Sequence, residues 1–268
     1  DAIATSDSVT VASGATLALN NFNQLVQDLS GAGIIALGTG TLTTQNTGDT
    51  AFDGSVTGTG GLTKTGIGVL TLSNTGNSVG AANVSGGTLH LTQTGTFNAA
   101  SLNVDNGATL QLDANSQIVS VGSAVIDGTL NVTLGGIAPL VTAADATLNS
   151  SSSTLDISGY TSGPVAKASD LDGARTVVIH TTGGITGDFG AVQGVSAGSA
   201  DYIITDAKKS ADGLDYSVGN SLAWNATAPL SSGTFTLNNA DTFDVDVVLA
   251  DKSANGAVWD GTSLTKAG

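Results

Sequence analysis

The sequence has no cysteine, no methionine and no glutamate, and only seven lysine and arginine residues stand against 22 acidic residues, all of them aspartate. Straight-chain residues such as Glu, Met, Lys and Arg lose little rotamer freedom in a helix, so their scarcity argues against helical structure. The lack of cysteine fits an oxidising, extracytoplasmic route on which stray disulfides are a hazard. A cytosolic protein can lack cysteine too, so composition alone predicts only that the chain has almost no helix.

The shortage of cations also limits the partners of the chain. Its formal net charge is −15. Nucleic acids and heparin-like glycans need clustered cations, and the only adjacent pair is Lys208 and Lys209. No apolar run approaches the roughly 18 residues of a membrane-spanning helix, and no signal segment precedes Asp1. We expect a soluble chain that does not bind nucleic acid and whose targeting signal has been removed.

The residues that are abundant favour strands and tight corners. Glycine occurs 37 times and hydrophobic residues make up 40% of the chain, but only 4% is aromatic. Threonine and valine are β-branched and fit a pleated surface. The interior must then be filled by Leu, Val, Ile and Ala, which predicts a long, thin core.

A short phrase recurs in which a glycine-containing turn precedes two alternating apolar positions. Its copies are S-G-A-T-L-A-L (13–19), G-T-G-T-L-T-T (38–44), G-I-G-V-L-T-L (66–72), S-G-G-T-L-H-L (85–91), N-G-A-T-L-Q-L (106–112) and D-G-T-L-N-V (127–132). The leading leucines, Leu17, Leu42, Leu70, Leu89, Leu110 and Leu130, are 25, 28, 19, 21 and 20 residues apart. This spacing suits one turn of a solenoid.

We predict an all-β, right-handed parallel β-helix of about 12 rungs, with rungs about 4.8 Å apart. Leu89 and Leu91 face the core and His90 faces water, because side chains alternate along a strand. A β-sandwich is the alternative, but it gives no reason to repeat one phrase every 20 residues or so. Repeats are expected over 1–159, a longer-stranded irregular excursion over 160–223, and resumed repeats over 224–268.

Residues 58–91 are similar to the passenger-associated transport repeat of bacterial autotransporters. The pattern G-x-G-x-L-x-K-x-G-x-G, L-T-L-S and G-G-T-L is carried by Gly58, Gly60, Leu62, Lys64, Gly66, Gly68, Leu70, Leu72, Gly86, Gly87, Thr88 and Leu89. This copy departs from the pattern near Ser78, where the family usually has an aromatic residue. The stretch 180–192 resembles adhesin-type passengers, and S-L-T-K-A-G (263–268) resembles the opening of a further transport repeat.

The resemblance implies a parallel β-helix, type V secretion and display on the cell surface through a C-terminal outer-membrane β-barrel of the same polypeptide. For this adhesin-like branch it implies adherence, autoaggregation and biofilm formation. The expected partners are passengers on neighbouring cells, with a host extracellular-matrix protein or glycan as a second class. The alternative is a structural stalk whose protease or esterase domain lies outside this chain. Polysaccharide cleavage is disfavoured because Arg175 is the only arginine.

Candidate catalytic motifs lack the structural context that they require. Gly194–Gly198 matches G-x-S-x-G, but no helix pattern follows it. His90 and His180 have no triad signature around them; we interpret His90 as a solvated strand residue and His180 as the cap of a buried strand. The stretch G-A-G-I-I-A (31–36) imitates a dinucleotide fingerprint but continues into another glycine-rich strand.

The candidate metal ligands are two acidic segments. Asp244 and Asp246 share one strand face and could offer oxygen ligands to calcium, although a solvated acidic face is the simpler interpretation. The segment Asp170–Gly173 lacks the other ligands of a calcium loop. The sequence therefore assigns no catalytic, cofactor-binding or metal-binding residue, and we expect a protein that is not an enzyme and needs no cofactor.

Overall fold

The computed structural model describes residues 8–120, 122–134, 139–158, 176–193, 203–222, 235–236, 257–259 and 263–266. These residues form 26 strands and no helix. The chain divides into two compact units, of which the first comprises 1–159, 177–193 and 209–216, and the second comprises 160–176, 194–208 and 217–268. The expectation of an all-β chain is confirmed for the described residues.

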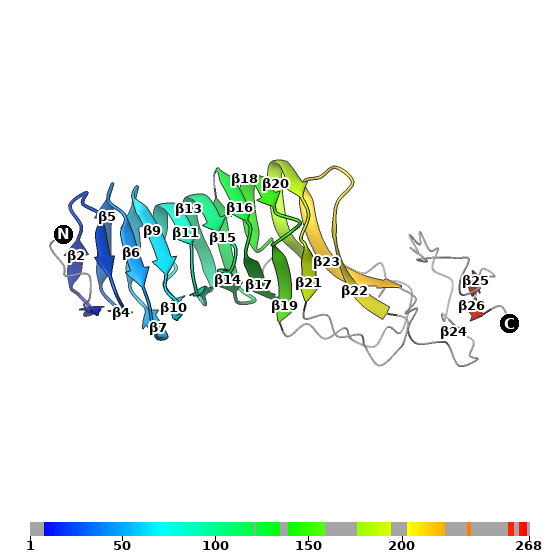
Figure 1. The fold of residues 1–268 in the computed structure, drawn as a ribbon, viewed down its shortest axis with the longest axis horizontal. Helices are drawn as coiled ribbons and strands as arrows, with labels where there is room; N and C mark the ends of the chain where they lie inside the picture. The colour runs from blue at the N-terminus through cyan, green and yellow to red at the C-terminus, as the bar shows by residue number, and fades with distance from the viewer. Residues whose placement is uncertain are drawn as a thin grey trace. The chain divides into compact units, whose positions relative to one another are not determined.

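A nine-stranded sheet runs along the first unit and takes one strand from each turn of the chain (Figure 1). Its members in order are β1 (Val9–Val11), β4 (Leu29–Gly31), β7 (Thr50–Phe52), β10 (Val69–Leu72), β12 (Thr88–Leu91), β14 (Thr109–Leu112), β17 (Thr129–Thr133), β19 (Thr154–Ser158) and β21 (Ala191–Gln193). Every neighbouring pair is parallel. We call it the first sheet.

The second sheet has 14 strands and takes one or two from each turn. Its members are β2 (Thr16–Ala18), β3 (Gln24–Val26), β5 (Ile34–Gly38), β6 (Leu42–Gln45), β8 (Ser55–Gly58), β9 (Gly61–Thr65), β11 (Ser78–Val84), β13 (Gly95–Val104), β15 (Ser116–Ser120), β16 (Ser123–Ile126), β18 (Val141–Leu148), β20 (Thr176–Gly187), β22 (Ile203–Lys209) and β23 (Asp215–Leu222). The two short strands β8 and β9 both pair with the single longer strand β11. A corner of the early turns thus becomes a continuous strand later.

The stacked parallel strands confirm the predicted β-solenoid and exclude a sandwich of two antiparallel sheets. Leu70, Leu89, Leu110, Leu130 and Leu155 are successive partners in the first sheet, and each is at most 1% exposed. Four of the six leading leucines therefore form an internal column together with Leu155. The nine strands of the first sheet match the expected count of about 12 rungs only roughly.

Two leucines of the predicted repeat belong to different columns. Leu17 pairs with Ile35 and Leu42 pairs with Leu62, all in the second sheet. The interpretation of all six leading leucines as equivalent positions one turn apart is therefore wrong. The motif of a tight turn followed by Thr-Leu occurs at more than one corner of the coil. Each corner requires a tight turn followed by an inward apolar residue, so the motif does not identify one corner. The separation of 28 residues compares strands of different sheets, and that of 25 compares β2 and β6, which pair with different neighbours within the second sheet.

Part of the segment 160–223 continues the solenoid, because β20 pairs in parallel with β18, and β21 with β19. In the second unit, β24 (Phe235–Thr236), β26 (Ser263–Lys266) and β25 (Ala257–Trp259) form an antiparallel three-stranded sheet. Most of 224–268 lies outside the described residues, so resumed repeats there stay a prediction. No helix in the described part of the chain has the length and apolar character needed to cross a bilayer.

Candidate functional site

The transport-repeat motif places a lysine inside the solenoid. Lys64 lies on β9 and is 0% exposed. It occupies an inward column of the second sheet whose other members are apolar except for Thr44. The column runs through Val26, Thr44, Lys64, Val84, Val104, Ile126 and Leu148. A charged group here must find its partners within the protein, because water does not reach it.

The Lys64 ammonium finds three carbonyl oxygens. Its Nζ donates to the carbonyl oxygens of Thr65 at 2.7 Å, Gly66 at 3.2 Å and Gly86 at 3.1 Å. An ammonium has three N–H donors and no acceptor, so its hydrogen-bonding capacity is filled. Thr65 and Gly66 belong to the same turn as Lys64, whereas Gly86 belongs to the next turn. The side chain therefore joins two turns from the inside.

The backbone geometry of the corners explains why the motif has glycine at these positions. Gly66 and Gly87 adopt positive φ angles of 75° and 59°. A Cβ on Gly66 would lie 2.3 Å from the Asn46 carbonyl oxygen, and one on Gly87 would lie 2.4 Å from that of Gly68. Only glycine tolerates both the backbone conformation and the close approach. The corners of successive turns can therefore stack tightly enough for their carbonyls to reach Lys64.

The surroundings of Lys64 disfavour its charge. Burial lowers the pKa of Lys64 from 10.5 to about 8, and the carboxylate of Asp49 opposes this shift. In the preceding turn, the hydroxyl of Thr44 and the side-chain oxygen of Asn46 are buried without a hydrogen-bond partner among the described residues. At neutral pH most of the amine is protonated, and its side chain is 0% exposed, so a substrate in solution does not reach it. The cluster is suited to holding structure, not to catalysis.

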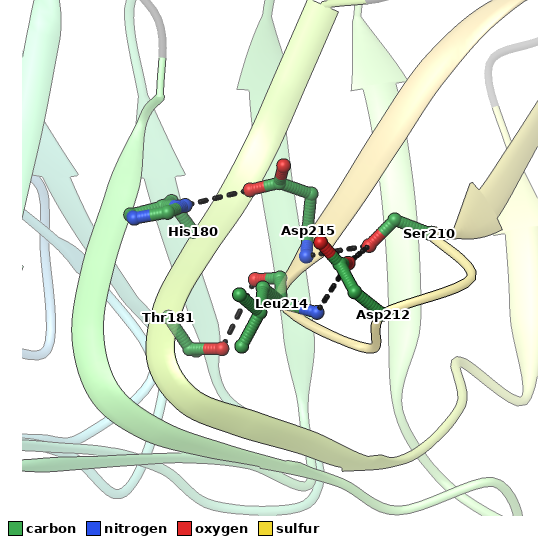
Figure 2. A network of polar contacts seen from close by, with 6 residues as sticks. All are labelled: His180, Thr181, Ser210, Asp212, Leu214 and Asp215. Atoms are coloured by element: carbon green, nitrogen blue, oxygen red, sulfur yellow. Dashed lines mark hydrogen bonds and ion pairs between the residues drawn. The ribbon is translucent and has the colours of Figure 1, made fainter.

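A second polar network lies around the turn between β22 and β23 (Figure 2). His180 Nδ1 lies 2.7 Å from Asp215 Oδ1, with the two side chains 40% and 35% exposed. The Ser210 hydroxyl donates to Asp212 Oδ1 at 2.5 Å, and the Leu214 amide donates to the same oxygen at 3.1 Å. These two hydrogen bonds lower the pKa of Asp212. The network closes the turn upon itself.

The geometry of this network does not make a catalytic triad. A triad needs a nucleophile bonded to the histidine nitrogen that the acid leaves free. The Ser210 hydroxyl instead binds Asp212, and the Thr181 hydroxyl donates to the Leu214 carbonyl at 3.0 Å. Within the described ranges no hydroxyl is hydrogen-bonded to the other nitrogen of His180.

The turn segment Lys209–Tyr216 instead covers exposed backbone of β20 and the corner that follows it. Lys209 Nζ donates to the carbonyls of Ile185 and Gly187 at 3.2 and 2.9 Å. The Tyr216 hydroxyl donates to Asp188 Oδ1 at 2.6 Å, and its ring packs edge-on against Phe189 at 5.0 Å. Such a cover satisfies backbone groups at the edge of the last described turn that would otherwise be unpaired. We call Lys209–Tyr216 the cap segment.

The remaining sequence candidates have these places. His90 points outward as predicted, with its side chain 21% exposed, and its Nε2 lies 2.9 Å from Asp113 Oδ1. Sequence reasoning missed this partner, which lies 23 residues away and is brought close by the stacking of turns. The dinucleotide-like stretch 31–36 runs into strand β5, so it has no helix N-terminus to hold a pyrophosphate.

The other candidates cannot be placed. Gly194–Gly198, Asp170–Gly173, Arg175, Asp244 and Asp246 lie outside the described residues. Among the residues that the structure describes, no three His, Cys, Asp or Glu side chains lie close enough together to bind a metal ion.

The outward positions of the first sheet form polar columns that sequence reasoning anticipated only in general terms. Thr88, Thr109, Thr129 and Thr154 stack in register over four turns. The neighbouring column contains Thr71, His90, Gln111, Asn131 and Asp156. These side chains are half-buried, and Asn131 Nδ2 donates to Asp156 Oδ2 at 2.8 Å. The first sheet thus presents hydroxyl and amide groups at regular intervals.

Neither a protein-family model nor a curated protein sequence matches the chain. The fold defines it as a parallel β-solenoid with a covered last described turn.

Proposed function

We propose that this chain is a segment of a secreted bacterial autotransporter passenger of the adhesin type, which mediates adherence, autoaggregation or biofilm formation at the cell surface. Its anchor would be a C-terminal outer-membrane β-barrel of the same polypeptide. The observation that carries the adhesive role is the pair of outward polar columns on the first sheet. Many weak hydrogen bonds along such columns add when two rods engage together.

Three further observations support the proposal. The residues that resemble the transport repeat have specific structural places here: the lysine is an inward clamp, and the glycines form stacked corners. No catalytic constellation occurs in the parts of the chain that the structure describes. The outward columns of the first sheet contain one carboxylate, Asp156, although the chain as a whole has a net charge of −15. A second carboxylate, Asp113, contacts His90 of these columns, and most of the other groups that two copies would bring together on this face are uncharged.

A second copy of the chain is the first partner to test. Beads coated with many copies provide the multivalency that self-association requires. Beads that carry the purified chain should clump. Beads that carry Thr88→Lys with Thr129→Lys should clump less, because two long charged side chains obstruct the first sheet on alternate turns. The matched control is Thr43→Lys with Asn83→Lys, which adds the same charge to alternate turns on the outward face of the second sheet.

The outcomes separate the proposal from its alternative. Clumping that is lost in the first variant and kept in the control supports adhesion through the first sheet. If parent beads stay dispersed and also fail to bind an immobilised matrix protein or glycan, the adhesive role is wrong. The chain would then fit the alternative better, as the stalk of a passenger whose enzymatic domain lies elsewhere.

A further inference from the structure

The apolar pattern of this solenoid leaves one ambiguity in how its turns stack. A slip of one residue along a strand turns every side chain to the opposite face, so burial excludes it. A slip of two residues keeps inward side chains inward. Between β9 and β11, for example, Lys64 could oppose Gly86, two residues beyond Val84, without exposing any apolar column. Similar turns stacked on one another therefore need another determinant of register.

Lys64 distinguishes these stackings. In the observed register its Nζ lies 3.1 Å from the carbonyl oxygen of Gly86 on the next turn. A slip of β11 by two residues moves that carbonyl along the strand by about 6.6 Å, which is beyond hydrogen-bonding distance. The buried ammonium would then lose its third acceptor in a place where water cannot replace it.

The energetics of the site indicate a role other than adding stability. Burial lowers the pKa of Lys64 to about 8, so the interior disfavours its charge. Asp49 of the preceding turn is the titratable group that acts on the ammonium. Lys64's own corner, 65–68, and the corner above it, 85–87, contain no ionisable side chain. Buried polar groups that reduce stability can still fix a unique arrangement when only that arrangement satisfies them.

We propose that Lys64 is a register pin: its hydrogen bonds to two successive turns select the observed stacking of β11 on β9 over stackings slipped by two residues. The pin works because its third acceptor, the Gly86 carbonyl, comes from the turn whose position it selects. Its effect is on the choice of structure during folding, and it is independent of any ligand.

Competition between two disulfides can test this, because the chain has no cysteine of its own. Thr63 and Asn83 are outward Cα partners next to Lys64, and neighbouring strands are about 4.8 Å apart. In the triple variant Thr63→Cys, Asn83→Cys, Ser85→Cys, the thiol at 63 bonds with that at 83 in the observed register. After a two-residue slip, the thiol at 63 bonds with the thiol at 85 instead. In the observed register the Cα atoms of residues 63 and 85 are about 8 Å apart, which is too far for a disulfide.

The readout is the ratio of the 63–85 to the 63–83 disulfide after refolding from urea in a glutathione buffer, measured by mass spectrometry of peptides. With Lys64 present, the 63–83 disulfide should dominate. Adding Lys64→Met should raise the ratio about tenfold, as expected for the loss of one charge-assisted hydrogen bond. Val84→Met is the matched control in the same column, and Lys64→Arg should keep the ratio low.

A second measurement covers the case in which Lys64→Met does not fold. Refolding the triple variant itself at pH 10 leaves Lys64 neutral, so that its amine has one N–H donor fewer. Thiols oxidise faster at this pH, but the ratio compares two disulfides of the same molecule, so the faster oxidation affects both alike. The ratio should rise above its value at pH 7. An unchanged ratio at pH 10, or in a folded Lys64→Met variant, would overturn the proposal.

Discussion

The ammonium nitrogen of Lys64 and the carbonyl oxygen of Gly86 lie 3.1 Å apart across two successive turns of the solenoid. Lys64 itself is 0% exposed. A positive charge is therefore held inside a largely apolar column by three backbone carbonyl groups, and the carboxylate of Asp49 also favours it. The free energy of unfolding must depend on whether that charge is present.

The stability of the first unit should rise with pH above about 8. The pKa of Lys64 is about 8 in the folded chain, whereas a solvated lysine, as in the unfolded chain, has a pKa of 10.5. Between these values the unfolded chain binds more protons, so the free energy of unfolding increases with pH. The full gain is about 3 kcal/mol, of which about 2 kcal/mol falls between pH 8 and pH 9.5. Urea unfolding across this range measures it.

Lys64→Met is the control for the pH effect, since it removes the group that titrates. Its free energy of unfolding should be nearly independent of pH over the same range. A parent protein whose stability falls between pH 8 and pH 9.5 would contradict the assignment of the lowered pKa to Lys64.

Gly87→Ala should be severely destabilising, whereas Gly48→Ala should not. A Cβ on Gly87 would meet the Gly68 carbonyl oxygen at 2.4 Å, and the residue has a φ of 59°. Left-handed backbone and overpacking against another backbone together predict a loss of about 3 kcal/mol or more. Gly48, at the corresponding corner of an earlier turn, has no atom within 4 Å of the added Cβ, so its change should stay within about 0.5 kcal/mol. Urea midpoints of the two variants provide the comparison.

The two faces of β12 should respond differently to substitution. Leu89→Asp places an unpaired charge at a position that is 1% exposed, and a loss of about 3–5 kcal/mol is expected. His90→Ala removes a partly exposed contact with Asp113, which predicts a loss of no more than about 1 kcal/mol. Thermal unfolding of both variants at pH 7 measures this difference. Equal melting temperatures would contradict the assigned faces.

The sequence predicted the solenoid because its core follows a local rule. Each corner requires glycine or another turn residue, and each following strand alternates inward leucine with outward polar residues, so the repeat is visible without an alignment. The same rule misplaced Leu17 and Leu42, since it states that a residue points inward but not which sheet it joins. Assignment to a sheet depends on the whole path of a turn.

The side-chain contacts of the candidate sites were less predictable because they join distant residues. His90 meets Asp113 across 23 residues, and His180 meets Asp215 across 35. Neither spacing follows from the local pattern, since the first reflects the stacking of turns and the second the return of the cap segment. Lys64 was recognised as a motif residue, but its inward position breaks the rule that charge faces water. A lysine at an inward position of an alternating strand, G-L-T-K-T, was the available signal.

The cap segment should open locally when Tyr216 loses its hydroxyl. Tyr216→Phe deletes the 2.6 Å hydrogen bond to Asp188 but keeps the edge-on contact with Phe189. Hydrogen bonds to a charged acceptor contribute about 2 kcal/mol, so the cap segment should detach more often while the rest of the solenoid stays folded. The amides of Thr181 and Ile185 donate to the Leu214 and Gly213 carbonyls, and they report this opening directly.

Amide hydrogen exchange of Thr181 and Ile185 should therefore accelerate roughly 10- to 30-fold in Tyr216→Phe. The Thr129 amide, which donates to the Ala108 carbonyl within the earlier turns, serves as the internal control and should not change. Acceleration of all three amides by the same factor would mean that the cap segment is part of one cooperative unit with those turns. Acceleration confined to the first two would show that the last described turn is held by a cover that can open on its own.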